Sequence, residues 1–457
     1  MRNLLPLKIG ILAALCIVFV IGFSVNERPL PDWRDGELVI ILPQADSLDQ
    51  PFNLHLAELF AAELGVKLKP IELYPSQVNG ALTSHQAHFS AIGMRSNEAD
   101  GTQKFGVPYQ AVNETVVCSG DQPSKPEELK AREIMVVAGS AQEAALRVVQ
   151  LEIPELSWEA VDRIKPGELL EYVANGEIDC TVANEEQLAF MRNLHPGLNA
   201  AFEIAEPTQL AWSFAADADA ELYAKMEKFF TRIEEDGTLE RLLERFYGHN
   251  ERILPFDAEA FLNKTSSVLP KYRSLFEEAA ALTGIEWQLL AAMAYRESHW
   301  NPLATSYTKV RGMMMLTEDT ADRMKVSNRL DARESIMAGA RYLQLLKEQL
   351  PLRIDEPDRT WFALAAYNQG MGHLEDARIL TQRYGMNADL WIDVQKSMVK
   401  LRQPHIAKTL KHGYGRGGEA VVFVETVRLY YDMLKRISRE EYRQQLPPDY
   451  QMRLNAY

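Results

Sequence analysis

The spacing of apolar residues changes once along the chain, near residue 254, and this change limits the folds that the sequence can adopt. Before it, short apolar runs alternate with helix-like stretches, as in "ELVIILPQ", "FNLHLAELFAAELG" and "KLKPIELY". After it, apolar residues recur at helical spacing, as in "EWQLLAAMAYRES" and "DRTWFALAAYNQG". The alternation predicts a parallel sheet wrapped by helices, and the remainder predicts a mainly α domain. A length of 457 residues agrees with more than one domain.

The N-terminal segment has the features of an export signal. Arg2 and Lys8 precede an apolar run from Ile9 to Phe23, which is shorter than the roughly 20 residues of a membrane-spanning helix. We therefore expect a secretory signal over residues 1–24, with an uncleaved anchor as the alternative. Export would permit a disulfide between Cys118 and Cys180, although two buried free thiols fit the sequence equally well.

Charge and motif content exclude several classes of function. The net charge of −15 argues against a nucleic-acid partner, because such proteins normally present a basic surface. The histidines show no metal-ligand pairing of the H-E-x-x-H kind. We therefore expect no metal and no cofactor.

The first half of the chain resembles the family 3 periplasmic solute-binding proteins. The resemblance rests on "FNLHLAELFAAELGVKLKPIEL", "GVPYQAVNETVV" and "GELLEYVANGEIDCTVAN", which occur in the family's order. It implies two α/β lobes with a ligand cleft between them, here over residues 25–253. Amino-acid-binding members carry Thr-x-x-Arg before the "PY" turn, which "GMRSNEADGTQKFGVPY" lacks, and Asn184 stands where they have Asp. These departures argue against a free amino acid as the ligand of this half.

Glu297 stands out in the helical half. It lies in "TGIEWQLLAAMAYRESHWNP", on the same helix face as Leu290 and Met293. Thr283 and Glu286 predict a capping box at the start of this helix. A carboxyl group in apolar surroundings has a raised pKa, as a general acid near neutral pH requires. The helix alone equally permits a structural glutamate paired with an arginine.

Four motifs around Glu297 resemble those of the soluble-type lytic transglycosylases, a lysozyme-like family. That family carries E-S, G-L-M-Q, A-Y-N and E-x-x-x-Y-V in this order. The matching segments here are "ES" at 297–298, "GMMMLT" at 312–317, "AAYNQG" at 365–370 and "GGEAVVFV" at 417–424. The resemblance implies a mainly α, lysozyme-like domain over residues 254–457. The solute-binding half and the Met-rich motif are typical of one membrane-bound subgroup.

The resemblance also implies the site residues. Glu297 would be catalytic, and the substrate-binding residues would be Ser298, Met314, Met315, Tyr367 and Asn368. Some of these have a structural alternative, since Ser298 could bond the backbone and Asn368 could simply end a helix. The sequence departs from the family at Met315, where most members have Gln, and at Phe423, where they have Tyr.

The implied activity is that of a carbon–oxygen lyase acting on peptidoglycan. Such an enzyme cleaves the bond between N-acetylmuramic acid and N-acetylglucosamine without water and leaves 1,6-anhydromuramic ends. One alternative is a hydrolytic muramidase resembling the goose-type lysozymes, and another is a receptor with an inactive enzyme domain. The resemblance further implies a periplasmic protein, peripherally attached to the inner face of the outer membrane of a Gram-negative cell.

Overall fold

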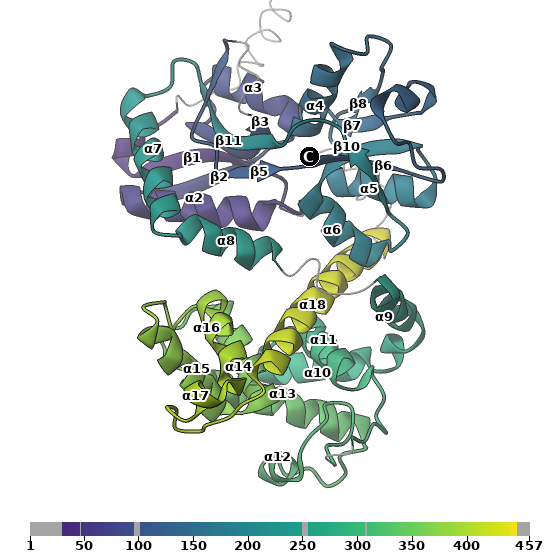
Figure 1. Cartoon of the computed structure of the whole chain (residues 1–457), viewed down its shortest axis with the longest axis vertical. Helices are drawn as coiled ribbons and strands as arrows, with labels where there is room; N and C mark the ends of the chain where they lie inside the picture. Colours follow the sequence, from purple (N-terminus) through teal and green to yellow (C-terminus); the bar gives the residue numbers. More distant parts are fainter. Residues whose placement is uncertain (1–29, 46, 96–100, 249–254, 307–308, 446–457) are drawn as a thin grey trace, which may run out of the picture. The chain divides into compact units, whose positions relative to one another are not determined.

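The computed structural model describes residues 30–45, 47–95, 101–248, 255–306 and 309–445 (Figure 1). The predicted signal over residues 1–24 lies outside these ranges. The chain divides into two compact units, one formed by residues 1–110 with 209–229 and the other by 111–208 with 230–457. Within the described ranges, no helix is long and apolar enough to span a membrane.

The first unit is built on a mixed sheet with the strand order β2-β1-β3-β11-β4. Strands β1, β2 and β3 are parallel, as the alternating pattern predicts. Strand β11 runs antiparallel to its neighbours β3 and β4, so the prediction of a parallel sheet is wrong for these pairings. Alternation reveals the presence of a strand but not its direction. The strands are β1 (Glu37–Leu42), β2 (Lys67–Glu72), β3 (Phe89–Arg95), β4 (Gln103–Phe105) and β11 (Thr208–Ala215).

Helices cover both faces of this sheet (Figure 1). On one face, Val39 of β1 packs with Leu82 of α3. On the other, the Phe60 ring of α2 packs against Phe89 and Trp212 of the central strands. The central strands are therefore buried on both sides, which explains their continuous apolar runs. The helices are α2 (Gln50–Leu64), α3 (Pro75–Thr83) and α7 (Ala220–Glu235).

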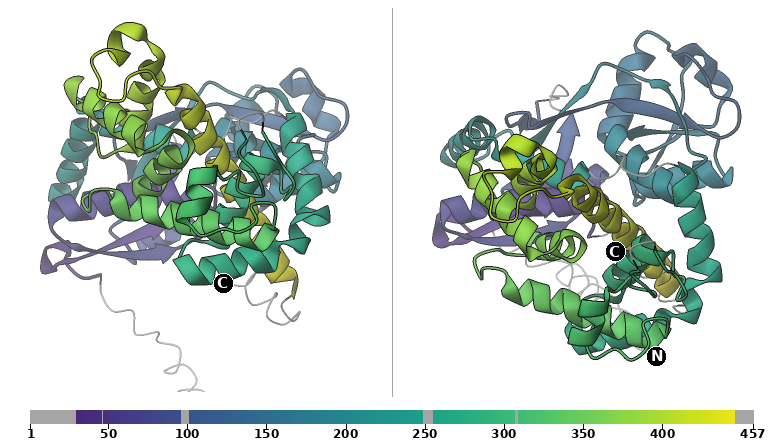
Figure 2. Two further views of the ribbon diagram at one scale, coloured as in Figure 1. Left: turned by 90° about the horizontal axis from the view of Figure 1, so that it is seen from below. Right: turned by 60° about the horizontal axis from the view of Figure 1, so that its bottom comes forward.

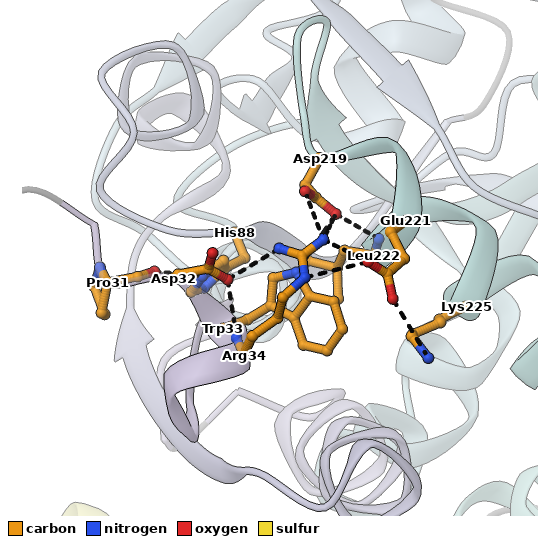
Figure 3. A network of polar contacts seen from close by, with 9 residues as sticks. All are labelled: Pro31, Asp32, Trp33, Arg34, His88, Asp219, Glu221, Leu222 and Lys225. Atoms are coloured by element: carbon orange, nitrogen blue, oxygen red, sulfur yellow. Dashed lines mark hydrogen bonds and ion pairs between the residues drawn. The ribbon is translucent and has the colours of Figure 1, made fainter.

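A network of charged side chains fixes the start of the described chain to α7 (Figure 3). Arg34, in the turn η1 (Trp33–Asp35), contacts Asp219 at 3.1 Å and Glu221 at 2.7 Å. The Trp33 indole N–H donates to Asp219 at 3.4 Å. Exposed ion pairs contribute only about 0–1 kcal/mol each, so several contacts must act together to hold this turn.

The second unit begins with an α/β part. Its strands form the antiparallel sheet β10-β6-β9 and the parallel pair β7-β8. Cys118 and Cys180 lie opposite each other on β6 and β9 and form a disulfide, which answers the question that the sequence left open. Strand β5 (Gln110–Val112) belongs to the first sheet, where it pairs with β11. The elements of this part are β6 (Glu114–Cys118), η2 (Pro126–Ala131), β7 (Met135–Val137), α4 (Ala141–Gln150), β8 (Glu159–Val161), α5 (Pro166–Asn175), β9 (Cys180–Asn184), α6 (Glu185–Leu194), β10 (Ala200–Glu203) and α8 (Thr238–Tyr247).

The rest of the second unit is helical, as predicted. Within the residues described after 254, β structure is limited to isolated bridges. The long helix α18, at the yellow end of the colour bar in Figure 2, packs against α11 and α14. The helices are α9 (Pro255–Ser267), η3 (Leu269–Lys271), α10 (Arg273–Thr283), α11 (Trp287–Ser298), α12 (Glu318–Arg323), α13 (Ala332–Gln349), α14 (Asp358–Gln369), α15 (Met371–Arg383), α16 (Trp391–Met398), η4 (Val399–Arg402), α17 (Pro404–Ala407) and α18 (Gly417–Gln445).

The predicted capping box at Thr283 is wrong. Thr283 is the last residue of α10, and its hydroxyl donates to the carbonyl of Ala279 at 2.8 Å. Gly284 then adopts a left-handed conformation with φ of 71°, which ends α10. Helix α11 begins only at Trp287, after Glu286, whose side chain makes no capping hydrogen bond. The T-x-x-E spacing therefore spans the junction of two helices.

Candidate active site

Glu297 lies in the last turn of α11, at the end of a helix that runs through the core. Leu290 and Met293, which share its face, are fully buried, as predicted. The helix stops immediately after Ser298, because His299 and Trp300 both have positive φ, 52° and 57°. The buried Trp300 indole N–H donates to the carbonyl of Ala291 at 2.8 Å, which fixes this reversal against the helix. The carboxyl group is thus held at the point where the core helix ends.

The surroundings of Glu297 favour its protonated form. Burial raises the pKa of its carboxyl group to about 8, and the neighbouring Arg296 opposes this only in part. The cause is desolvation, which penalises a carboxylate more than a neutral acid. The side chain nevertheless remains partly exposed, so a ligand can reach it. At neutral pH it can therefore donate a proton, as a general acid must.

Ser298 and Tyr367 both hold the turn that carries the Met-rich motif. The Ser298 hydroxyl contacts the Met313 carbonyl at 2.8 Å and the Ala294 carbonyl at 3.1 Å. The Tyr367 hydroxyl donates to the Met314 carbonyl at 2.8 Å. Ser298 was predicted either to bind substrate or to hydrogen-bond to the backbone, and the structure shows the bond to the backbone. Residues from three motifs therefore meet at this turn.

Tyr367 is electrostatically coupled to Glu297. Burial raises the pKa of the Tyr367 phenol well above its usual value, and the Glu297 carboxylate and Tyr342 raise it further. The phenol is therefore neutral at physiological pH. The neighbouring Asn368 is exposed at the end of α14, and its side-chain oxygen accepts a hydrogen bond from Gln369 at 3.2 Å. Asn368 is thus available to a ligand.

The two methionines predicted to bind substrate differ in exposure. Met314 is fully buried, so a contact with substrate would come from its backbone. Met315 is partly exposed and has a φ of 47°, a left-handed conformation that non-glycine residues seldom adopt. Such conformations cluster at functional sites. Phe423 is 2% exposed and belongs to the same core as α11, so the residue that replaces the family tyrosine fills space there.

Two residues missed at the sequence level come from α13. The Met314 amide donates to the Ser335 hydroxyl oxygen at 3.1 Å. The Tyr342 ring packs against that of Tyr367, with the ring centroids 5.3 Å apart. No motif contains these residues. The sequence offered one signal for them, namely that Ser335, Gly339 and Tyr342 are spaced so as to share one helix face.

The structure also bears on other types of site. Across the part of the chain described, no three His, Cys, Asp or Glu residues come together in a way that could hold a metal ion. In the α/β part, Asn184 accepts a hydrogen bond from the Gln187 amide at 2.8 Å and thereby caps α6. The side chain at the family's ligand-binding aspartate position therefore has a structural role here.

Two family models match successive parts of the chain. The family described as "Transglycosylase SLT domain" matches residues 274–389, and "Bacterial extracellular solute-binding proteins, family 3" matches residues 50–249. Among solved structures, an ancestral arginine-binding protein bound to arginine is 20% identical with a TM-score of 0.41, over 46% of this chain and 98% of that one.

Curated relatives match most of the chain. A protein from Nitrosospira multiformis is 47% identical over 425 residues, which cover 90% of this chain and 88% of that protein. One from Methylobacillus flagellatus is 45% identical over 365 residues, which cover 79% of this chain and 77% of that protein. Both are named membrane-bound lytic murein transglycosylase F. The chain therefore belongs to the membrane-bound lytic murein transglycosylase F family.

Proposed function

We infer that this chain is a murein-degrading lytic transglycosylase in which Glu297 is both the general acid and the general base. The family and its SLT domain support the activity. The observation that carries the assignment of Glu297 is its position at the end of a core helix, where burial raises the pKa of its carboxyl group to about 8. The enzyme is accordingly a lyase that acts on glycan strands.

One carboxyl group can serve both steps of this reaction. Glu297 first protonates the oxygen between N-acetylmuramic acid and N-acetylglucosamine, and the bond to the anomeric carbon breaks. The substrate's own N-acetyl group stabilises the positive centre that develops. Glu297, now a carboxylate, then accepts the proton of the C6 hydroxyl as that oxygen attacks the anomeric carbon. The product is a 1,6-anhydromuramic end, and no water is consumed.

The surroundings of Glu297 support this route over hydrolysis. Inverting hydrolysis needs a second carboxylate to activate water. Among the residues described, Arg296 is the charged side chain that shifts the pKa of Glu297, and no acidic side chain does so. The tethered C6 hydroxyl, by contrast, gains from proximity. Met315 and Asn368, both accessible, are the residues we propose to contact the sugar beside Tyr367.

The masses of the released products test this assignment. Purified murein sacculi would be digested with the full chain, with Glu297→Gln, and with Glu348→Gln, an exposed carboxylate on α13 that serves as the matched control. We expect fragments one water lighter than reducing muropeptides from the wild type and the control, and none from Glu297→Gln. Reducing ends would instead establish hydrolysis, and full activity of Glu297→Gln would remove Glu297 from the mechanism.

We further propose that the solute-binding-like part, within residues 25–253, takes a peptide or muropeptide from the cell wall and changes the lytic rate. Its family match and the capping role of Asn184 support a ligand other than a free amino acid. Calorimetric titration of the full chain with wall peptides and free amino acids, followed by rate measurements at saturation, would test this. Equal rates with and without every peptide would contradict regulation.

The location of the enzyme follows from its substrate. We propose that residues 1–24 direct export and that the mature protein attaches peripherally to the inner face of the outer membrane. The Cys118–Cys180 disulfide supports an oxidising compartment, such as the periplasm. N-terminal sequencing of the mature chain and membrane fractionation with a high-salt wash would test both points. A chain that still begins at Met1 would favour the uncleaved anchor.

A further inference from the structure

One face of α13 lies against the active-site turn. Ser335, Gly339 and Tyr342 are spaced four and three residues apart, which places them on the same side of a helix. Ser335 contacts the backbone of the turn, Gly339 faces the Met314 side chain, and Tyr342 packs on Tyr367. Each of these three residues on α13 therefore contacts the Met-rich turn or Tyr367.

The peptide group between Met313 and Met314 is held at both ends by serine hydroxyls. Its carbonyl accepts a hydrogen bond from Ser298 on α11 at 2.8 Å, and its amide donates to Ser335 on α13 at 3.1 Å. Both serines are buried, with exposures of 9% and 0%. A buried amide without an acceptor is unfavourable, so loss of the Ser335 oxygen would force the turn to move toward water.

Two glycines allow the turn and α13 to come this close. A Cβ atom at Gly339 would lie 2.7 Å from the Met314 side chain. Gly312, at the start of the turn, has a φ of 85°, and a Cβ atom there would lie 2.9 Å from the Ser335 hydroxyl oxygen of α13 and would overlap the Arg329 carbonyl oxygen. No room is left for a side chain at either position.

The next carbonyl in this turn, that of Met314, determines which hydrogen-bonding capacity Tyr367 has left. The Tyr367 hydroxyl proton is used in the bond to the Met314 carbonyl, so the phenol oxygen keeps only its capacity to accept. A phenol oxygen that can only accept favours the protonated form of a neighbouring carboxyl group over the carboxylate. If the Met314 carbonyl moved away, the hydroxyl dipole would be free to turn, and a negative charge on the electrostatically coupled Glu297 would be favoured instead.

We propose that the Ser335–Gly339 face of α13 holds the Met313–Met315 turn in place. Ser335 is then a positioning residue for the reaction at Glu297. Ser335 acts through the Met313–Met314 peptide, which Ser298 next to Glu297 also holds, and through the following carbonyl, which binds Tyr367. Ser335 does not touch the substrate. The inference rests on the proposed role of Glu297. The charged or titratable groups coupled to that site are Arg296 from α11, Tyr367 from α14 and, through Tyr367, Tyr342 from α13.

The test compares Ser335→Ala with a matched control in the full-length enzyme. Ser397→Ala removes another hydroxyl that is 0% exposed in the same helical part and has no hydrogen-bond partner among the described residues. Release of anhydro ends from purified glycan strands would be followed from pH 5 to 9.5, and melting would be recorded for each variant. Gly339→Ala disturbs the same contact between α13 and the turn, because its methyl group would meet the Met314 side chain. Alanine favours a helix, so α13 itself should not be weakened by this substitution.

For Ser335→Ala we expect kcat to fall at least about tenfold with KM within about twofold, because the substrate contacts remain while the acid is misplaced. The alkaline limb of the pH profile should move to lower pH by at least about 0.5 unit, since a freed phenol donor favours the carboxylate. Gly339→Ala should change both quantities in the same direction, and it replaces Ser335→Ala if that variant does not fold. Ser397→Ala should keep the wild-type values.

Two outcomes would overturn the inference. The first is a folded Ser335→Ala or Gly339→Ala enzyme with wild-type kcat and a wild-type alkaline limb. The second is an equal shift of the limb in Ser397→Ala, which would show a nonspecific effect. Glu297→Gln belongs in the same experiment, because its full activity would remove the proposed function, whereas its inactivity beside an unchanged Ser335→Ala would remove this inference alone.

Discussion

Replacing Glu297 by glutamine should stabilise the folded protein, and the gain should grow as the pH rises. Burial raises the pKa of this carboxyl group from 4.5 to about 8. A raised pKa means that the folded chain tolerates the neutral acid but not the carboxylate. The group therefore costs little stability below pH 4.5, and the cost accumulates as the pH rises through the folded-state value near 8. Glutamine has a similar shape and no charge, so the variant avoids this cost.

The size of the effect follows from the two pKa values. One pKa unit corresponds to about 1.4 kcal/mol, so a group that titrates at 4.5 unfolded and about 8 folded loses about 4 kcal/mol of folding free energy between pH 5 and 8.5. This value is an upper estimate, because the side chain is partly exposed and water screens its charge. A region of 150–250 residues melts about 2–4 °C higher for each kcal/mol gained.

Scanning calorimetry of the wild type, Glu297→Gln and the exposed control Glu348→Gln at pH 5 and pH 8.5 measures this directly. At pH 5 we expect the three melting temperatures to lie within about 2–4 °C, equivalent to 1 kcal/mol. At pH 8.5 Glu297→Gln should melt several degrees above the other two. A difference between Glu297→Gln and the wild type that is the same at both pH values would refute the argument that burial controls this carboxyl group.

Three further outcomes follow from the same geometry. The kcat/KM of the wild type should fall above about pH 8, as Glu297 loses its proton, and a pH–rate profile would check this. Tyr367→Phe should lower stability by about 1–3 kcal/mol in urea unfolding and slow turnover, because the buried Met314 carbonyl loses its donor; unchanged values would contradict the role of this bond. Replacing Cys118 and Cys180 by alanine opens a link across 62 residues and should lower stability by about 4 kcal/mol, whereas no change in unfolding midpoint would show that the disulfide is dispensable.

Local signals were the most predictable part of this fold. Gly65 ends α2 in a left-handed conformation, and Ser140 caps α4 by accepting a hydrogen bond from Glu143. Each signal depends on a few adjacent residues, so a sequence pattern can identify it. The T-x-x-E pattern at Thr283 failed because the left-handed Gly284 ends one helix inside the motif. The direction of β11 could not be predicted, because its neighbour β3 lies more than a hundred residues earlier in the chain.

The active site shows the same limit. The apolar stripe through α11 indicated a buried setting for Glu297, since helical spacing determines which residues share a face. The partners of Ser298 and Tyr367 are backbone carbonyls 15 and 53 residues away. Every residue has a backbone carbonyl group, so no sequence motif can identify which one will accept such a bond. Ser335 was missed for this reason, because its partner is the amide of Met314.

The central position of β11 has a consequence for how the protein is made. Strand β11 lies between β3 and β4 in the first sheet, although residues 111–208 separate it in sequence from the rest of that unit. As the chain emerges from the ribosome, the first sheet therefore stays incomplete until residue 215 has appeared. Pairing over such a distance is slow, because a long loop must close before the contacts form. The edges of β3 and β4 stay open meanwhile, and this interval is when the new chain most needs a chaperone.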